Sequence, residues 1–190
     1  MRKENIEIIK NGGIGIIPTD TIFGIVGLAS SPIAVKRINE IKKRDADKGF
    51  IILISSLGDL DGFGAEVSKR AKIFLKKFWP GALSVVLSVK KENFPHLIKP
   101  NDTLAFRMPK DDSLLSILKE TGPLVAPSAN PQGLPPARNV TEAKKYFGNE
   151  VDFYEEGNCD NNLPSTVIKI TADKLEILRE GSVKINIRDF

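Results

Sequence analysis

Short apolar runs alternate along this chain with longer stretches in which apolar residues recur at helical spacing. Phe50–Ile54, for example, is too short and too apolar for anything but a buried strand. Similar runs, typical of strands, occupy residues 14–18, 22–29, 83–89, 103–107, 124–126, 166–170 and 175–178.

Helix-start signals precede several of the longer stretches. Ser31-Pro32 is a strong start, because serine accepts hydrogen bonds from free backbone amides and proline at the first helical position loses none. Asn139, with Glu142 three residues later, resembles a second capping pair. The pattern predicts helices near residues 6–11, 32–41, 67–78, 114–120 and 139–147.

Strands that alternate with helices indicate an α/β domain, but hairpin-length spacings near both ends of the chain argue against a purely parallel sheet. We therefore predict a twisted, mixed β-sheet with flanking helices. The chain has 190 residues and is 41% apolar, which is sufficient for one hydrophobic core. No repeat or linker divides it, so we expect a single domain over residues 1–190.

Cysteine and histidine are too rare for several kinds of site. Cys159 is the only cysteine and His96 the only histidine, which excludes a CxxC zinc site and a disulfide framework. No apolar run reaches the roughly 18 residues of a membrane helix, and the N-terminus does not resemble a signal peptide. We expect a cytoplasmic protein that has no membrane partner and no metal site of its own.

The formal charge of +4 is unevenly distributed. Residues 69–91 contain seven basic and no acidic side chains, whereas residues 151–190 contain eight acidic and five basic ones. Such asymmetry suits an anionic ligand or RNA, although a charged helix is more often only a solvated face.

Common nucleotide-binding motifs are missing. Gly13-x-Gly15 continues to Pro18 where a dinucleotide fingerprint requires glycine, and the sequence contains no GK[ST] phosphate loop. A nucleotide, if bound, must be held in another way.

Polar residues follow the predicted strands, where α/β sheets present groups to ligands. One set is Pro18–Thr21, and another is Pro127–Asn130. Ser128 and Asn130, two residues apart, share a side of an extended backbone and could donate to phosphate or carbonyl oxygens. Ordinary turn chemistry is the alternative for both sets.

A group of cations follows one predicted helix. Lys42 and Arg44 are two residues apart, so outside a helix they can point the same way, and Lys48 is close enough to join them. Three convergent cations match a triphosphate, although lysines also decorate helix C-termini. Leu163–Thr166 leads into a strand, and Arg179 ends the next one. Together these sets predict a basic, hydroxyl-lined pocket for a phosphorylated ligand.

Motifs that allow comparison with known families occur in order along nearly the whole chain. They are IIPTDTIFGIVGLA (16–29), IKKRDADKG (41–49), FWPGALSVVL (78–87), TLAFRMP (103–109), APSANPQG (126–133), PSTV (164–167) and LREG (178–181). These segments resemble the YrdC family, the threonylcarbamoyl-AMP synthases, and the paired KxR and SxN motifs make the resemblance specific.

The resemblance implies a nucleotidyltransferase that condenses L-threonine, bicarbonate and ATP, with its Mg²⁺, into threonylcarbamoyl-AMP and pyrophosphate. Other proteins then transfer the threonylcarbamoyl group to the adenosine beside the anticodon of tRNA. The implied fold is a twisted α/β sheet around a large basic cavity. The implied site residues are Lys42, Arg44, Ser128 and Asn130 for catalysis; Arg44, Lys48, Thr103, Ser128 and Arg179 for ATP; and Thr21, Arg107, Ala126 and Ser165 for threonine.

Two other classes stay open. A non-catalytic protein could bind tRNA, rRNA or double-stranded RNA through residues 69–91, but aromatic side chains for base stacking are scarce there. Hydrogenase-maturation carbamoyltransferases contain a similar domain, but they are much larger and carry zinc-type cysteine motifs, whereas this chain has one cysteine.

Overall fold

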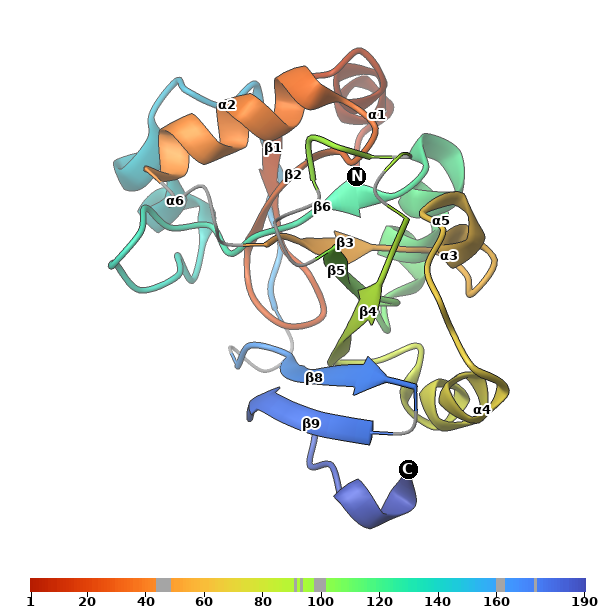
Figure 1. Cartoon of the computed structure of the whole chain (residues 1–190). Helices are drawn as coiled ribbons and strands as arrows, with labels where there is room; N and C mark the ends of the chain where they lie inside the picture. Colours follow the sequence, from red (N-terminus) through yellow and green to blue (C-terminus); the bar gives the residue numbers. More distant parts are fainter. Residues whose placement is uncertain (44–48, 91, 93, 98–101, 160–162, 173) are drawn as a thin grey trace.

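The structure is a computed structural model, and it describes residues 1–43, 49–90, 92, 94–97, 102–159, 163–172 and 174–190. These residues form one mixed sheet with helices on both faces (Figure 1). The predicted fold class, a mixed α/β sheet with flanking helices, is confirmed.

The element boundaries agree closely with the apolar pattern. The helices are α1 (Lys3–Lys10), α2 (Pro32–Lys42), α3 (Asp59–Gly62), α4 (Lys69–Phe78), α5 (Asp112–Thr121) and α6 (Val140–Phe147), with a 3-10 turn η1 (Ile187–Asp189). The strands are β1 (Gly15–Ile17), β2 (Gly24–Leu28), β3 (Ile51–Leu53), β4 (Leu83–Ser88), β5 (Thr103–Arg107), β6 (Leu124–Val125), β7 (Phe153–Tyr154), β8 (Thr166–Thr171) and β9 (Lys174–Arg179).

The strands lie in the order β7-β1-β2-β6-β3-β5-β4-β8-β9. Pairing is parallel between β1 and β7, β3 and β5, and β4 and β8, and antiparallel between the other neighbours. The hairpin-length connections β1–β2 and β8–β9 give antiparallel pairs, as their spacing predicted.

Two predicted helix starts are confirmed by their caps. The Ser31 hydroxyl accepts a hydrogen bond from the Ala34 amide at 3.2 Å, and the Asn139 side chain accepts one from the Glu142 amide at 2.9 Å. The Glu142 carboxylate accepts from the Arg138 amide at 2.9 Å, one residue before the amide that a capping box would use.

The lysines of α4 lie on its exposed side, and its apolar residues face the core. Ala71, Phe74 and Leu75 are buried in the main hydrophobic cluster, which Phe78 and Trp79 also join. The prediction that the lysines of this helix face solvent is therefore confirmed.

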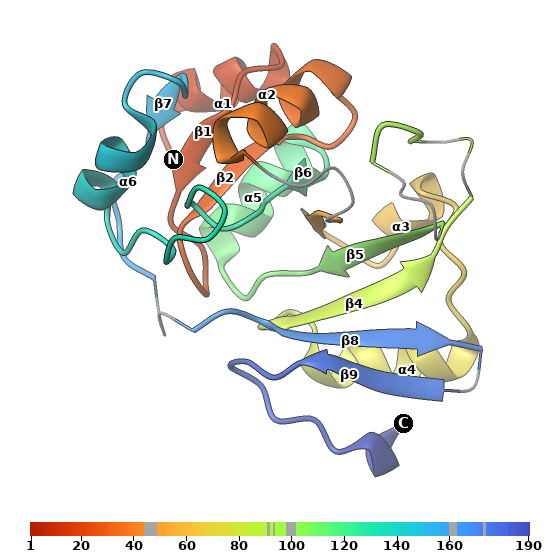
Figure 2. The ribbon, with the colours of Figure 1, turned by 60° about the vertical axis from the view of Figure 1, so that its left-hand side comes forward.

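The sheet has two faces because successive side chains along a strand alternate. On one face, a row that includes Ile16, Ile25 and Ile52 packs with α2, α4 and α6. On the other face, Ile17, Val26, Leu53 and their neighbours pack with α1 and α5. The strand residues that pack with α1 and α5 lie in β7, β1, β2, β6 and β3, and Figure 2 shows β5, β4, β8 and β9 running on beyond this layer. Helices α1 and α5 therefore do not cover this part of the sheet face, and a cavity lies there.

The apolar pattern did not predict α3 or β7. Strand β7 has only two residues, and it depends on parallel pairing with β1, in which Gly15 is opposite Phe153. A Cβ atom at Gly15 would overlap the Phe153 ring, so glycine is required by a contact between segments far apart in the sequence. No local pattern carries that information.

In the part of the chain that the structure describes, none of the helices combines the length and apolar character needed to cross a membrane.

Asp152 ties α2 to the sheet. Its carboxylate accepts hydrogen bonds from Arg37 at 2.7 and 3.0 Å and from the Ile14 amide at 2.7 Å. The hydrogen bond from Arg37 lowers the pKa of Asp152 below its ordinary value of 3.8; partial burial acts in the opposite direction, and the Ile14 amide and the charge of Arg37 lower it further.

We expect Asp152→Asn to reduce the free energy of unfolding by about 1 kcal/mol at neutral pH, a small value because solvent screens this partly exposed pair. A lowered pKa gives stability that is present above the unfolded value and is lost as pH falls through the folded one. Urea unfolding of both proteins should therefore show a constant difference near neutral pH that shrinks as the pH falls below the ordinary aspartate pKa of 3.8. A difference that grew on acidification would contradict this interpretation.

Candidate functional site

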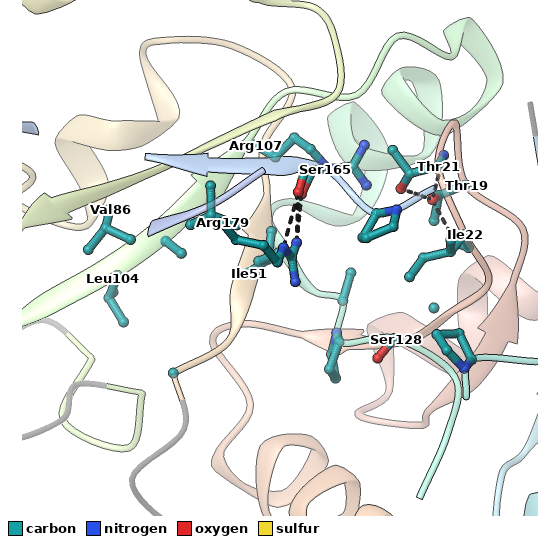
Figure 3. A pocket seen from close by; sticks show the side chains of 18 of the residues that line it. Thr19, Thr21, Ile22, Ile51, Val86, Leu104, Arg107, Ser128, Ser165 and Arg179 are labelled. Carbon is teal, nitrogen blue, oxygen red and sulfur yellow. Dashed lines mark hydrogen bonds between the residues drawn. The ribbon is translucent and has the colours of Figure 1, made fainter. Parts of the chain in front are cut away.

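A cavity of about 480 Å³ lies on the sheet face beyond α1 and α5. Its wall comes from the β1–β2 connection, the segments that follow β6 and precede β8, strand β5 and the end of β9. Figure 3 shows Arg107, Ser165 and Arg179 on one side of the open space and Ser128 on the other. The volume falls within the usual range for sites that bind small molecules.

Strand β5 lies along this wall. Thr103, Ala105 and Arg107 occupy alternate positions and line the cavity, whereas Phe106 between them is buried in the core. At about 3.3 Å per residue, Thr103 and Arg107 are about 13 Å apart. One cavity can therefore contact a ligand, or two adjoining ligands, over this length.

Arg107 is a buried cation whose hydrogen bonds are incomplete. Only 5% of its side chain is exposed, and Nη1 donates to the Asp20 carboxylate, whose side chain is 3% exposed. The second Asp20 oxygen accepts from the Lys110 amide at 2.9 Å. Among the described residues, the buried Nε of Arg107 has no partner. Nη1 is the only guanidinium nitrogen with a partner among the described residues, and Arg107 lines the cavity, so the guanidinium can still donate through Nη2 to an anionic ligand.

The hydroxyl hydrogens of the β1–β2 connection can be assigned from their partners. Thr19 Oγ1 donates to the Ile22 carbonyl at 2.8 Å and accepts from the Thr21 amide at 3.2 Å. Because Thr19 has used its only hydrogen, its 3.0 Å contact with Thr21 Oγ1 requires Thr21 to be the donor. Thr21, which lines the cavity, then offers a ligand only acceptor lone pairs.

Arg179 is held beside Ser165 at the end of β9. Its Nη2 donates to the Ser165 carbonyl at 2.8 Å, and Ser165 Oγ lies 2.8 Å from Ser84 Oγ (Figure 3 shows the Arg179 bonds). Burial lowers the pKa of Arg179, but a guanidinium stays charged at neutral pH. Gly181 permits this arrangement, because a Cβ atom there would overlap the backbone of Pro164 and Ser165.

The Ser128–Asn130 loop is internally bonded. Ser128 Oγ donates to Asn130 Oδ1 at 2.5 Å, and Asn130 Nδ2 donates to the carbonyls of Pro131 at 3.0 Å and Leu134 at 2.7 Å. Sequence reasoning assigned donor roles toward a ligand to both side chains. In the structure the Asn130 side-chain amide donates to backbone carbonyls. Ser128 lines the cavity, and its hydroxyl oxygen can still accept a hydrogen bond from a ligand.

Lys42 lies behind this loop. Its residue is 2% exposed, and Nζ donates to the carbonyl oxygens of Ser128 and, at 2.6 Å, of Asn130. The Gln132 amide also donates to the Lys42 carbonyl at 2.8 Å. Lys42 thus fastens the end of α2 to the Ser128–Asn130 loop and is not one of the cavity-lining residues.

Most of the predicted site residues gather at this cavity. Arg44 and Lys48 lie outside the described residues, and Lys42 and Asn130 support the wall from behind. The predicted residues that line it are Thr21, Thr103, Arg107, Ala126, Ser128, Ser165 and Arg179.

Sequence reasoning assigned no site role to Asp20, Thr19 or Ser84. Asp20 was considered only as a member of the Pro18–Thr21 set, with an ordinary turn as the alternative. Its partner Arg107 is 87 positions away, and no local pattern links the two. The only usable signal was its place beside Thr21 in the PTDT motif.

The described cavity wall contains two cations, Arg107 and Arg179, several hydroxyls and no carboxylate. Within the described ranges, no group of three or more His, Cys, Asp or Glu side chains could hold a metal ion. Such a wall suits the binding and alignment of anionic substrates, with catalysis by positioning and electrostatics.

The chain is similar to one known protein family, to several named proteins and to several solved structures. The Sua5_yciO_yrdC family model, described as "Telomere recombination", matches residues 7–181. The threonylcarbamoyl-AMP synthases of Bacillus subtilis (strain 168) and Pyrococcus abyssi (strain GE5 / Orsay) are 31% and 35% identical over 93% of this chain. They are longer proteins, of which the chain spans about half, 52% and 53%.

A relative of similar length is the threonylcarbamoyl-AMP synthase of Pseudoalteromonas translucida (strain TAC 125), 30% identical over 85% of this chain and 89% of its own. Among solved structures, P. abyssi Sua5 complexed with L-threonine superimposes with a TM-score of 0.87 at 32% identity, over 94% of this chain and 53% of that one. E. coli YciO gives 0.84 at 25% identity, over 94% and 87%.

Proposed function

The chain belongs to the Sua5/YciO/YrdC family, and on that premise we propose that it is a threonylcarbamoyl-AMP synthase, a nucleotidyltransferase that uses ATP, L-threonine and bicarbonate. The observation that carries this proposal is that one cavity is lined by hydroxyls, by Arg179 and by Arg107, whose guanidinium is bonded through Nη1 alone among the described residues. The names of the related proteins support a catalytic function over simple RNA binding.

The threonine site is proposed around Arg107. Its guanidinium pairs with the amino-acid carboxylate, for which it is geometrically suited. Thr21 Oγ1 accepts a hydrogen bond from the amine or hydroxyl of the ligand, and the small Ala126 leaves room for the threonine side chain. Ser165 completes this set. The complex of P. abyssi Sua5 with L-threonine supports placing an amino acid in this fold.

The ATP site is proposed along the rest of the wall, with Thr103, Ser128 and Arg179. Arg44 and Lys48 are proposed to contact the phosphates. Because Ser128 Oγ donates to Asn130, it accepts from a ligand N–H or O–H and does not donate to a phosphate. The described wall has no carboxylate, so the Mg²⁺ is proposed to arrive with the triphosphate, where it would neutralise developing negative charge.

The proposed reaction has two bond-forming steps. The threonine amine attacks the carbon of bicarbonate, and loss of water leaves a carbamate. A carbamate oxygen then attacks the α-phosphorus, and the bond to the leaving pyrophosphate breaks. No protein nucleophile is required, because the chain's contribution is alignment of the two substrates and cationic stabilisation. The product would be used by separate proteins that modify the adenosine beside the anticodon of tRNA, and a cytoplasmic location fits this use.

The test is an assay of the purified protein with Mg²⁺, ATP, L-threonine and bicarbonate, each omitted in turn. We expect pyrophosphate release and a product with the mass of threonylcarbamoyl-AMP only in the complete mixture. Salt-sensitive RNA binding without ATP consumption would instead favour the RNA-binding alternative. ATP turnover that does not depend on threonine would also contradict the proposal.

A further inference from the structure

Asp20 and Arg107 form an ion pair in the wall of the cavity, and they come from distant parts of the chain. Asp20 belongs to the β1–β2 connection, and Arg107 ends β5. One Asp20 oxygen accepts from Arg107 Nη1, and the other accepts from the Lys110 amide at 2.9 Å. Both carboxylate oxygens are therefore bonded to the segment in which β5 ends.

These bonds restrict what Asp20 can do. A carboxylate with both oxygens bonded to N–H groups is poorly placed to accept a proton from a substrate or to bind a metal ion. Asp20 also is not among the residues that line the cavity, whereas Arg107 is. Any effect of Asp20 on a ligand must therefore pass through Arg107.

The pair differs from one that serves stability alone. Buried ion pairs are stable only when their remaining hydrogen-bonding groups are satisfied, and apolar replacements are often at least as stable. Arg107 Nε is buried and has no partner among the described residues, although Nη1 is bonded. The protein thus holds the guanidinium by Nη1 and, because Arg107 lines the cavity, leaves Nη2 for a molecule there.

We propose that Asp20 is a positioning residue that holds the Arg107 guanidinium in the orientation that receives the carboxylate of the amino-acid substrate. This inference rests on the proposed function, because it takes threonine as the ligand. A free arginine side chain has several rotatable bonds, and fixing it in advance reduces the ordering that binding requires. Loss of Asp20 should therefore weaken threonine binding and leave the nucleotide contacts intact.

Asp152 provides a matched control. Like Asp20, its carboxylate accepts hydrogen bonds from one arginine and one backbone amide, Arg37 and Ile14, but none of these three residues lines the cavity. Asp20→Asn and Asp152→Asn therefore remove the same kinds of contact, one buried beside the site and one partly exposed away from it. Asp20→Glu is a second variant that keeps a negative charge for the buried arginine and so guards against failure to fold.

The experiment measures L-threonine binding by calorimetry, and KM for threonine and ATP in the adenylate assay, for wild type and the three variants. We expect Asp20→Asn to raise the threonine Kd and KM roughly ten- to hundredfold, the effect of a lost charge-assisted hydrogen bond. Asp20→Glu should raise both constants in the same direction, because its longer side chain pairs with Arg107 but displaces the guanidinium. KM for ATP should change less than about twofold. Asp152→Asn should leave both constants near wild type.

L-Threoninamide, which lacks the carboxylate, separates positioning from general damage. The affinity for L-threoninamide should be the same in wild type and in the Asp20 variants, because this ligand has no carboxylate for Arg107 to bind. Equal losses for threonine and threoninamide, or unchanged threonine binding in folded Asp20 variants, would overturn the role of Asp20. A wild-type protein that binds threonine but forms no adenylate would overturn the proposed function, and the binding measurements would still decide about Asp20.

Discussion

Replacing Lys42 with methionine is expected to reduce adenylate formation by at least about a hundredfold, the scale seen when a preorganised catalytic contact is lost. The Lys42 ammonium is buried and donates to the carbonyls of Ser128 and Asn130. Methionine fills a similar volume but donates nothing, so these carbonyls lose a partner and the loop that carries Ser128 is released from α2.

The same substitution should lower stability. The Ser128 carbonyl keeps a hydrogen bond from the Asn130 amide at 2.9 Å, so among the described residues only the Asn130 carbonyl loses its partner. An unsatisfied polar group of this kind costs about 1–3 kcal/mol. In a domain of this size, that corresponds to a decrease in Tm of about 2–12 °C, measured by thermal unfolding. Lys36→Met, on the exposed side of the same helix, removes the same charge and should change neither activity nor Tm appreciably.

The two measurements also distinguish two roles for Lys42. If it anchors the loop, Tm and turnover fall together. If it binds the triphosphate directly, as the KxR motif suggested, ATP affinity falls while Tm stays near the wild-type value. Wild-type turnover by a folded Lys42→Met protein would contradict both roles.

Arg107→Met should abolish threonine-dependent pyrophosphate release and strongly destabilise the fold. The substitution removes the proposed carboxylate site and leaves Asp20 as a buried carboxylate bonded only to the Lys110 amide. Breaking a buried ion pair in this way costs about 3–5 kcal/mol. Urea unfolding should show this loss in the free energy of unfolding.

The double variant Arg107→Met/Asp20→Asn separates the two effects. A neutral amide at position 20 removes the unpaired buried charge, so stability should recover by at least about half. Activity should not recover, because the ligand's carboxylate still has no arginine. Recovery of threonine-dependent turnover in the double variant would show that Arg107 is not the carboxylate site.

Helices and strands could largely be predicted from local patterns, because the signals are local. Ser31 and Asn139 cap their own helices, and the alternation along β5 depends only on residues 103–107. Strand β7 could not be predicted in this way, because its two residues are strand only through pairing with β1.

Local sequence patterns likewise predicted only part of the candidate site. The motifs identified the residue types that gather at the cavity, but not their hydrogen-bonding roles. Ser128 and Asn130 were expected to donate to a ligand, and the structure shows their hydrogens used within the loop. A serine hydroxyl has one hydrogen and a carboxamide two, so the partners decide what is left for a ligand.

By itself, the sequence determined the mixed α/β class, most of the elements and a set of polar residues at strand ends that resembles one family. Only the tertiary structure decided that Lys42 faces a loop instead of the cavity, and that Asp20 pairs with Arg107 across 87 positions. The physical reason is that apolar periodicity and caps act over a few residues, whereas the direction of a buried cation depends on which distant carbonyls and carboxylates the folded sheet brings to it.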